Sequence, residues 1–378
     1  MPENRLAERI RQRIKKEGPV PFSEFMRMAL YEPQLGYYTS ADTAIGKGGD
    51  FYTSPHLHPA FGWMLARTIE EMWEKAGKPG FFTIIEQGPG KGLMAKDILG
   101  WLRGNSPSFY EALTYRLVEM NPAMNEIQQG LIRQHRGKIE WHEDISGIQA
   151  GSGVLLANEL IDAFPVHLIQ INGQPMEVFV TLDKLDKFTE TLAPPSWPAI
   201  NEYLADFLID KDEIGPGYRT EVNLDMKRWL LQASRVFEQG FVLVIDYGWT
   251  ARQYLSPERN RGTLMCYYKH QALEDPYVHV GEQDITAHVN FSALKKWAAA
   301  AGFECIGYCE QGTFLVAAGI EKVITGLPVA ELAKIKGLIL PGTMGETHKV
   351  MALYKKGPSE QATPELAGFS LRNRAGTL

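Results

Sequence analysis

One short segment combines an acidic residue with three closely spaced glycines. It reads Glu86-Gln-Gly-Pro-Gly-Lys-Gly92 and follows Phe81–Ile85, whose β-branched and aromatic residues predict a buried strand. A helical apolar pattern continues from Gly92 to Leu102. Because glycine has no Cβ, a ligand can approach the backbone closely at Gly88, Gly90 and Gly92. A glycine loop between a strand and a helix predicts a ligand site of the nucleotide-binding type.

The spacing of the glycines does not fit the two common phosphate loops. A dinucleotide loop, G-x-G-x-x-G, would need glycine where the chain has Leu93. A mononucleotide P-loop would need Lys and Ser or Thr after Gly92, which is followed by Leu93 and Met94. An acid directly before the loop suits a ligand that carries an ammonium group, such as S-adenosylmethionine (SAM). We therefore predict SAM as the cofactor, with NAD as the weaker alternative.

Further acidic residues follow the next predicted strands. Glu119 ends the strand after the glycine loop, where an acid accepts hydrogen bonds from ribose hydroxyls, and Asp144 follows the third strand, in a suitable place for the adenine amino group. Each acid alone could belong to a solvated turn, but together they predict a nucleoside site. The residues predicted to bind SAM are Glu86, Gly88, Gly90, Gly92, Glu119, Met120, Asp144, Ile145, Asn158, Tyr38, Phe51 and Thr53.

The elements around these residues alternate between strand-like and helix-like patterns, which is typical of βαβ units and a parallel sheet. The predicted strands are Phe81–Glu86, Leu113–Glu119, Lys138–His142, Val154–Asn158, Phe241–Asp246, Phe303–Tyr308 and Lys349–Tyr354. We predict an α/β fold, a Rossmann-like class I SAM methyltransferase sheet that is mostly parallel and doubly wound.

The expected organisation has three parts. Residues 1–58 form an N-terminal helical and cofactor-covering segment, in which the tyrosine- and glycine-rich loop from Gly36 to Ser54 is expected to lie over the cofactor. Residues 59–356 form the methyltransferase domain, with a large insertion at about 165–240 between the fourth and fifth strands. Residues 357–378 have no periodicity and are expected to be a disordered tail.

Composition limits the class of partner and the compartment. The formal net charge of −6 gives no overall basic field, so nucleic acid is not expected as a partner, although a local basic patch would escape this count. Three cysteines suit a reducing compartment, and we expect a cytoplasmic protein. No metal site is expected, because no Cys/His cluster completes a ligand set. No apolar run reaches 18 residues, so no membrane insertion is expected.

An ordered series of motifs runs along the chain from about Leu6 to Tyr354. The motifs are Gly18-Pro-Val-Pro-Phe-Ser-Glu-Phe25, Gly36-Tyr-Tyr38, Gly49-Asp-Phe51, Thr53-Ser-Pro55, Glu86–Gly92, Asn158–Ala163, His288-Val-Asn-Phe291 and Gly345-Glu346. This series resembles the MidA family of SAM-dependent methyltransferases. That family includes the mitochondrial complex I assembly factor that methylates an arginine of a complex I subunit.

The resemblance implies a protein arginine N-methyltransferase that acts on a respiratory complex I type subunit or another protein. Paired carboxylates can orient a guanidinium and assist proton loss, and Glu159 with Asp162 could do this, joined by Glu221 or Asp246. Alternatively, Glu159 binds SAM and Asp162 closes a turn. Two other functions stay open, a SAM methyltransferase for a small molecule and a SAM-binding assembly factor with little turnover. The sequence also leaves a homodimer open.

Overall fold

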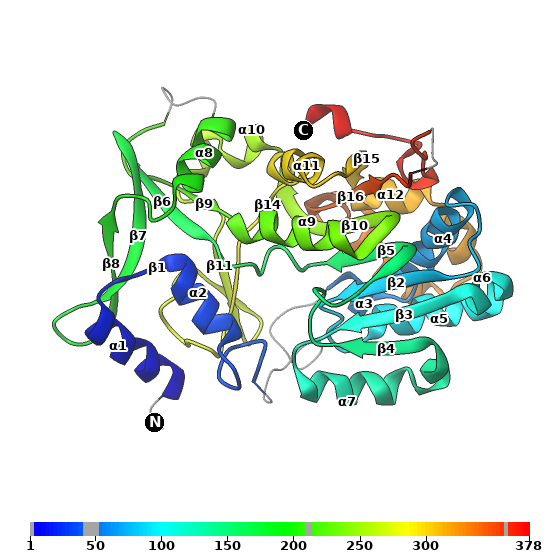
Figure 1. Cartoon of the computed structure of the whole chain (residues 1–378), viewed down its shortest axis with the longest axis horizontal. Helices are drawn as coiled ribbons and strands as arrows, with labels where there is room; N and C mark the ends of the chain where they lie inside the picture. The colour runs from blue at the N-terminus through cyan, green and yellow to red at the C-terminus, as the bar shows by residue number, and fades with distance from the viewer. Residues whose placement is uncertain (1–3, 41–52, 209–213, 359–361) are drawn as a thin grey trace. The chain divides into compact units, whose positions relative to one another are not determined.

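The chain folds into two compact units, each built from several segments (Figure 1). The computed structural model describes residues 4–40, 53–208, 214–358 and 362–378. Unit 1 consists of Met1–Phe51, Ile161–Arg228 and Trp249–Leu294, and unit 2 consists of Tyr52–Leu160, Trp229–Gly248 and Lys295–Leu378. None of the helices in these described ranges is both long and apolar enough to cross a membrane.

Unit 2 contains the predicted sheet. Its strands are β2 (Phe82–Gln87), β3 (Leu113–Val118), β4 (Ile139–His142), β5 (Ala150–Asn158), β10 (Phe237–Trp249), β15 (Glu304–Glu310) and β16 (His348–Lys355). They follow the order β15-β16-β10-β5-β2-β3-β4. From β10 to β4 all neighbours are parallel, whereas β16 is antiparallel to both β10 and β15. The order reverses between β2 and β5, which is where doubly wound sheets bind their ligands. The predicted Rossmann-like fold is confirmed.

Helices cover the sheet because both of its faces are apolar. On one face, Ile84, Leu156 and Leu243 share a hydrophobic core with α4, α5, α12 and α14. Ile85 and Leu155 point the other way and are also fully buried, as in other sheets with two covered faces. The helices that carry residues of unit 2 are α3 (Ser54–Leu57), α4 (Ala60–Lys75), α5 (Leu93–Asn105), α6 (Pro107–Ala112), α7 (Pro122–Leu131), α9 (Leu224–Val236), α11 (Phe291–Ala300), α12 (Gln311–Ala317), α13 (Ile320–Ile324), α14 (Val329–Ile339) and α15 (Met344–Thr347).

Unit 1 is built on a small antiparallel sheet in which β7 pairs with β6, β8 and β1, and β6 also pairs with β9. β6 and β7 form a hairpin, with Gly173 of the Asn172-Gly173 turn at a φ of +76°. The strands of this unit are β1 (Val20–Pro21), β6 (His167–Asn172), β7 (Gln174–Leu182), β8 (Phe188–Ala193), β9 (Tyr218–Val222), β11 (Met265–Tyr268), β12 (Gln271–Leu273), β13 (Asp284–Thr286) and β14 (Val289–Asn290), and its helices include α1 (Arg5–Glu17), α2 (Phe22–Tyr31), α8 (Pro198–Phe207) and α10 (Ala251–Tyr254).

The structure groups the chain differently from the three expected parts. The N-terminal segment does not stand alone, because Val20 pairs with Val180 of the insertion and the apolar side chains of α1 join the same hydrophobic core. The segment Trp249–Leu294 also belongs to this unit. An amphipathic helix and a two-residue strand need partners to bury their apolar sides, and the insertion supplies them.

The C-terminal segment is not the disordered tail that the sequence predicts. Residues 362–378 are ordered, and Phe369 is buried against Gly307 of β15. The Asn373 side chain accepts a hydrogen bond from the Tyr308 N–H at 3.2 Å, and the Arg374 N–H donates to the Tyr308 carbonyl at 2.7 Å. Because β15 is the last strand of the sheet, its outer backbone groups need partners, and the tail provides them. Residues 359–361 lie outside the described ranges.

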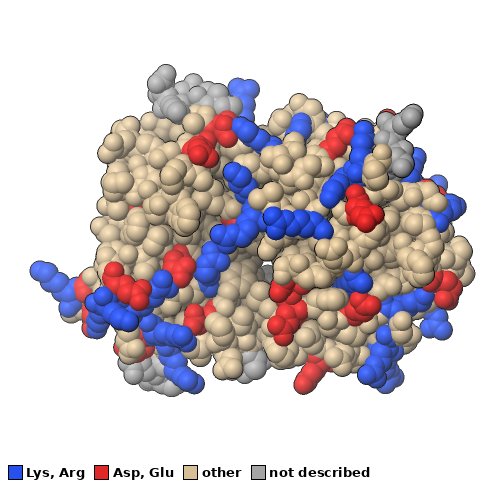
Figure 2. All heavy atoms as spheres, viewed as in Figure 1, with Lys and Arg blue, Asp and Glu red and all other residues tan. Residues whose placement is uncertain are grey.

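Charged side chains are unevenly spread over the surface. Figure 2 shows Lys and Arg side chains gathered over α9, whose exposed residues include Lys227, Arg228 and Arg235. The chain as a whole has a formal net charge of −6. A local basic strip therefore exists that net charge does not reveal, so the expectation of no nucleic-acid partner stays a prediction.

Candidate functional site

The glycine loop between β2 and α5 follows a backbone path that requires glycine. Gly88, Gly90 and Gly92 have φ values of +70°, +52° and +79°, in the left-handed region. A Cβ added at Gly92 would lie 3.2 Å from the Gln128 side chain, and one at Gly88 would lie 3.2 Å from Leu160. The loop therefore presents bare backbone at the start of α5, as the sequence predicts for a close ligand.

Glu119 follows β3 and belongs to the same end of the sheet. It is 9% exposed, and its carboxyl accepts hydrogen bonds from the Asn121 N–H at 2.8 Å and from Gln128 Nε2 at 3.4 Å. Burial raises the pKa of this carboxyl to about 7. A buried, oriented carboxyl at this strand end fits the ribose hydroxyls of a nucleoside.

Gln128 of α7 is a site residue that the sequence reasoning missed. Its Nε2 donates to the Gly90 carbonyl at 2.7 Å and to Glu119, while its Oε1 accepts from the Trp141 indole at 3.1 Å. One fully buried amide thus joins the glycine loop, the predicted ribose ligand and β4. The signal in the sequence was a polar residue on the buried face of a helix, four positions after Met124.

Glu86 lies inside β2 and is 2% exposed. Its carboxyl accepts a hydrogen bond from the Tyr115 hydroxyl at 2.6 Å, and burial, with a contribution from Asp97, raises its pKa to about 8. Among the residues that the structure describes, no Lys, Arg or His forms an ion pair with it. A buried acid of this kind suits the ammonium group of a bound ligand, so the residues present fit SAM.

Three further residues that the sequence predicts to bind SAM follow β3 and β4. Asp144 is exposed and accepts hydrogen bonds from the backbone N–H and the hydroxyl of Ser146, which lower the pKa of its carboxyl. Ile145 is buried, and Met120 is 51% exposed. Asp144 therefore has a turn-stabilising role that accounts for its position, and its contact with adenine stays a prediction.

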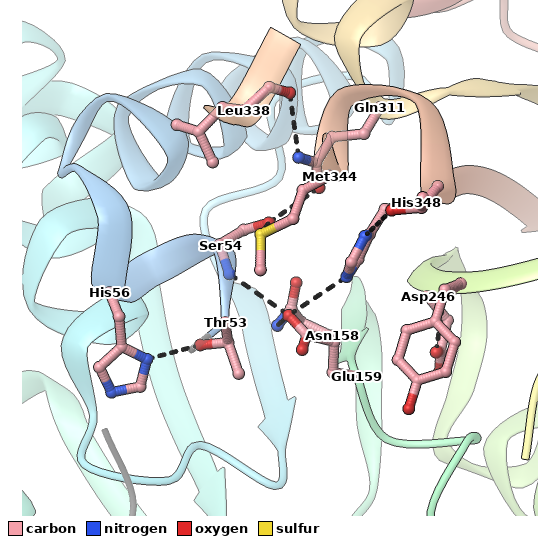
Figure 3. A network of polar contacts seen from close by, with 12 residues as sticks. Thr53, Ser54, His56, Asn158, Glu159, Asp246, Gln311, Leu338, Met344 and His348 are labelled. Atoms are coloured by element: carbon pink, nitrogen blue, oxygen red, sulfur yellow. Dashed lines mark hydrogen bonds and ion pairs between the residues drawn. The ribbon is translucent and has the colours of Figure 1, made fainter. Parts of the chain in front are cut away.

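The end of β5 holds a second group of polar residues. Glu159 has a φ of +47°, which is rare for a residue other than glycine, and such strained positions often carry function. Figure 3 shows its carboxylate between Ser54 and His348. Glu159 Oε1 accepts from the Ser54 N–H at 3.3 Å and from Asn158 Nδ2 at 3.4 Å, and it lies 3.7 Å from His348 Nε2. Asn158 and Glu159, both predicted from the sequence, thus lie together.

Buried hydrogen bonds hold Ser54, and through it the Glu159 carboxylate, in position. Ser54 is fully buried, and its hydroxyl donates to Gln311 Oε1 at 3.0 Å, while Gln311 Nε2 donates to the Leu338 carbonyl at 3.1 Å (Figure 3). The predicted Thr53 lies next to Ser54, and its hydroxyl is 2.7 Å from His56 Nδ1. Sequence reasoning missed Gln311 and His348, although the Gly345-Glu346 motif lies two residues before His348.

Two other predicted carboxylates have structural partners. Asp246 of β10 is fully buried and accepts from the Tyr247 N–H at 2.9 Å. Glu221 of unit 1 accepts hydrogen bonds from the N–H groups of Thr263 and Leu264 and from the hydroxyls of Thr263 and Tyr254. These contacts give Glu221 the role of anchoring the 263–264 backbone, so a catalytic role is not needed to explain its burial.

The remaining predicted residues belong to unit 1. Asp162 is 5% exposed there, so the predicted pair with Glu159 is divided between the two units. The Tyr38 hydroxyl donates to Asp284 at 2.8 Å, and its ring stacks on Tyr31. Phe51 lies outside the described residues. The roles of Asp162 and Tyr38 stay predictions.

Comparisons with known proteins identify the class of protein. Residues 64–309 match the model of a family described as "Putative S-adenosyl-L-methionine-dependent methyltransferase". The mouse mitochondrial protein arginine methyltransferase NDUFAF7 is 31% identical over 376 residues, which cover 90% of this chain and 82% of the mouse protein. The Drosophila melanogaster homologue is 28% identical, with 92% and 84% covered.

A crystal structure from Burkholderia thailandensis with bound S-adenosyl-homocysteine (SAH) superimposes with a TM-score of 0.87 and 29% identity. It covers 99% of this chain and 96% of that chain. The fold, the glycine loop with its buried acids and the family match together identify SAM as the cofactor. The chain therefore belongs to this family of SAM-dependent methyltransferases.

Proposed function

We propose that this methyltransferase transfers a methyl group to a guanidinium nitrogen of an arginine in a protein. The observation that carries the proposal is the Glu159 carboxylate, held in place by three neighbours at the end of β5. Relatives that are similar over most of this chain carry the name protein arginine methyltransferase. We keep the expectation that the acceptor is a subunit of respiratory complex I type or another protein.

The chemistry requires a carboxylate near the acceptor. A guanidinium is cationic at neutral pH, and its charge is delocalised over three nitrogens, which makes each of them a poor nucleophile. A fixed carboxylate that accepts hydrogen bonds from two of the nitrogens concentrates the positive charge there and leaves the third more nucleophilic. The bound cofactor supplies an electrophilic methyl group on a sulfonium. In this proposal, Glu159 orients the guanidinium, Glu119 holds the ribose and the glycine loop lies against the methionine moiety.

The test is direct identification of the methylated product. The full-length enzyme would be incubated with methyl-labelled SAM and a protein extract from cells that lack this gene, and the labelled protein would be hydrolysed. We expect label in methylarginine, and none when Glu159→Gln replaces the wild-type enzyme. Label in another amino acid, or only in the small-molecule fraction, would overturn the assignment of arginine.

A further inference from the structure

His348 is the buried titratable group next to Glu159 to which no role has yet been assigned. It begins β16, and its side chain is 6% exposed, while that of Glu159 is 10% exposed. The imidazole Nε2 lies 3.7 Å from Glu159 Oε1, within ion-pair distance (Figure 3). Contacts between catalytic groups are often this long before the substrate binds and shorten in the complex.

The other ring nitrogen shows which tautomer faces Glu159. His348 Nδ1 lies 3.1 Å from Thr347 Oγ1, and the same hydroxyl donates its proton to the Thr343 carbonyl at 3.3 Å. A threonine hydroxyl has one proton, so when that proton goes to the Thr343 carbonyl the hydroxyl can only accept from His348. This hydrogen-bond pattern fits a ring proton on Nδ1, with Nε2 facing Glu159 as an acceptor.

In this tautomer two hydrogen-bond acceptors, Glu159 Oε1 and His348 Nε2, face each other. A carboxylate oxygen and the lone pair of an imidazole repel each other unless a proton lies between them. A proton placed between the two side chains would remove this repulsion, and the reaction releases one, because a methylated guanidinium that keeps its single positive charge must lose an N–H proton.

We propose that His348 receives, through Glu159, the proton released by methyl transfer; this rests on the proposed function above. The attacking guanidinium nitrogen forms a bond to the methyl carbon, the carbon–sulfur bond breaks, and its electron pair stays on sulfur in SAH. The N–H proton passes to the Glu159 carboxylate and then to His348 Nε2. The products are methylguanidinium, SAH and an imidazolium paired with the restored carboxylate. His348 acts through Glu159, as a positioning residue for the proton.

The surroundings favour this route over proton loss to bulk water, because both side chains are almost fully enclosed. The titratable groups on the neighbouring elements include His56 on α3, Asp246 and Tyr247 on β10, Tyr308, Cys309 and Glu310 on β15, Glu346 on α15 and Lys349 on β16. The Tyr247 ring packs edge-on against the imidazole at 5.5 Å, and Lys349 donates to the Glu346 carbonyl. Within the described ranges, Glu159 is the only carboxylate in ion-pair contact with His348.

The first test compares two variants of the full-length enzyme. His348→Gln can offer Glu159 an amide N–H but cannot take up a proton, so SAH affinity should stay within a few fold while single-turnover methyl transfer falls by roughly two orders of magnitude. Free imidazole should restore part of the rate of His348→Ala and none of the rate of Glu159→Gln. A wild-type rate in His348→Gln would overturn the proton transfer and leave His348 as a support for Glu159.

The second test does not depend on the acceptor. Long-range ¹H–¹⁵N NMR of the enzyme–SAH complex should show His348 with its proton on Nδ1 at high pH, and Thr347→Val should disturb this tautomer. A proton on Nε2 would overturn the inference even if arginine methylation is observed. If the wild-type enzyme does not methylate arginine, the proposed function fails, whereas the NMR result still decides whether Nε2 faces Glu159 as an acceptor.

Discussion

Gln128 donates a hydrogen bond of 2.7 Å from its Nε2 to the carbonyl oxygen of Gly90, 38 residues away in the chain. The same amide contacts Glu119, so one side chain sets the distance between the glycine loop and the predicted ribose ligand. Replacement of this residue therefore tests whether that distance matters for the cofactor.

Gln128→Ala should weaken SAH binding by roughly tenfold, since it removes hydrogen bonds that contribute about 0.5–1.5 kcal/mol each. Isothermal titration calorimetry would measure the affinity. Gln129→Ala is the matched control, because Gln129 is exposed on the same helix and should behave like the wild-type protein. Equal affinities in the two variants would show that the Gln128 contacts do not shape the site.

The glycine loop should be specific for the adenosyl cofactor. Calorimetry should detect binding of SAM and SAH but not of NAD, and Gly90→Val should abolish both signals, because a branched side chain is strained at a φ of +52°. Gly100→Ala in α5 meets no atom within 4 Å of the added Cβ and should bind normally. Binding of NAD without SAM would contradict the cofactor assignment.

SAH affinity should depend on pH through Glu119. Its carboxyl must be ionised to accept hydrogen bonds from two ribose hydroxyls, and burial raises its pKa to about 7. Affinity should therefore fall as the pH drops below about 7. The pKa of Glu86, about 8, acts in the same direction, so the test is the difference between the wild-type protein and Glu119→Gln. An identical pH profile for both proteins would remove Glu119 from the site.

The buried Glu86 carboxyl should destabilise the ligand-free protein at high pH and strengthen the binding of SAH. Its folded-state pKa is raised from 4.5 to about 8, so its contribution to stability is fully present below about pH 4.5 and is lost as the pH rises through about 8. At pH 9 without ligand, Glu86→Gln should be more stable than wild type by on the order of a few kcal/mol, since one pKa unit corresponds to about 1.4 kcal/mol. The same variant should bind SAH more weakly. Urea unfolding at pH 5 and pH 9 would measure the first effect, and equal pH dependence would contradict it.

Glu159→Gln should separate binding from chemistry. SAM affinity should stay within a few fold, while methyl transfer falls by roughly two orders of magnitude, the scale expected for loss of a positioned acid–base group. Asp162→Asn should have the same effect if Asp162 is the second carboxylate, and little effect if it only closes a turn. If Glu159 instead holds the cofactor, its variant should lose SAM affinity in proportion to the rate.

The sequence by itself predicted the features that depend on local chemistry. The strand before Glu86, the glycines at 88, 90 and 92 and the acid at 119 follow from spacing, and alternation of strands and helices gave the sheet. The Asn172-Gly173 pair also predicts the hairpin between β6 and β7, since turn chemistry is local. The carboxylate at Glu159 was predicted because the ends of parallel strands meet at one edge of the sheet.

Only the tertiary structure showed the partners that come from distant parts of the chain. Ser54, Gln311 and His348 converge on the Glu159 network across almost 300 residues of sequence, and neither periodicity nor motif spacing records such contacts. The C-terminal segment resembles a disordered tail in composition, yet it is ordered because the edge strand β15 offers it backbone partners. The N-terminal segment and the insertion also form one unit, because each buries apolar surface of the other. Neither segment carries a local sequence pattern that identifies the other as its partner.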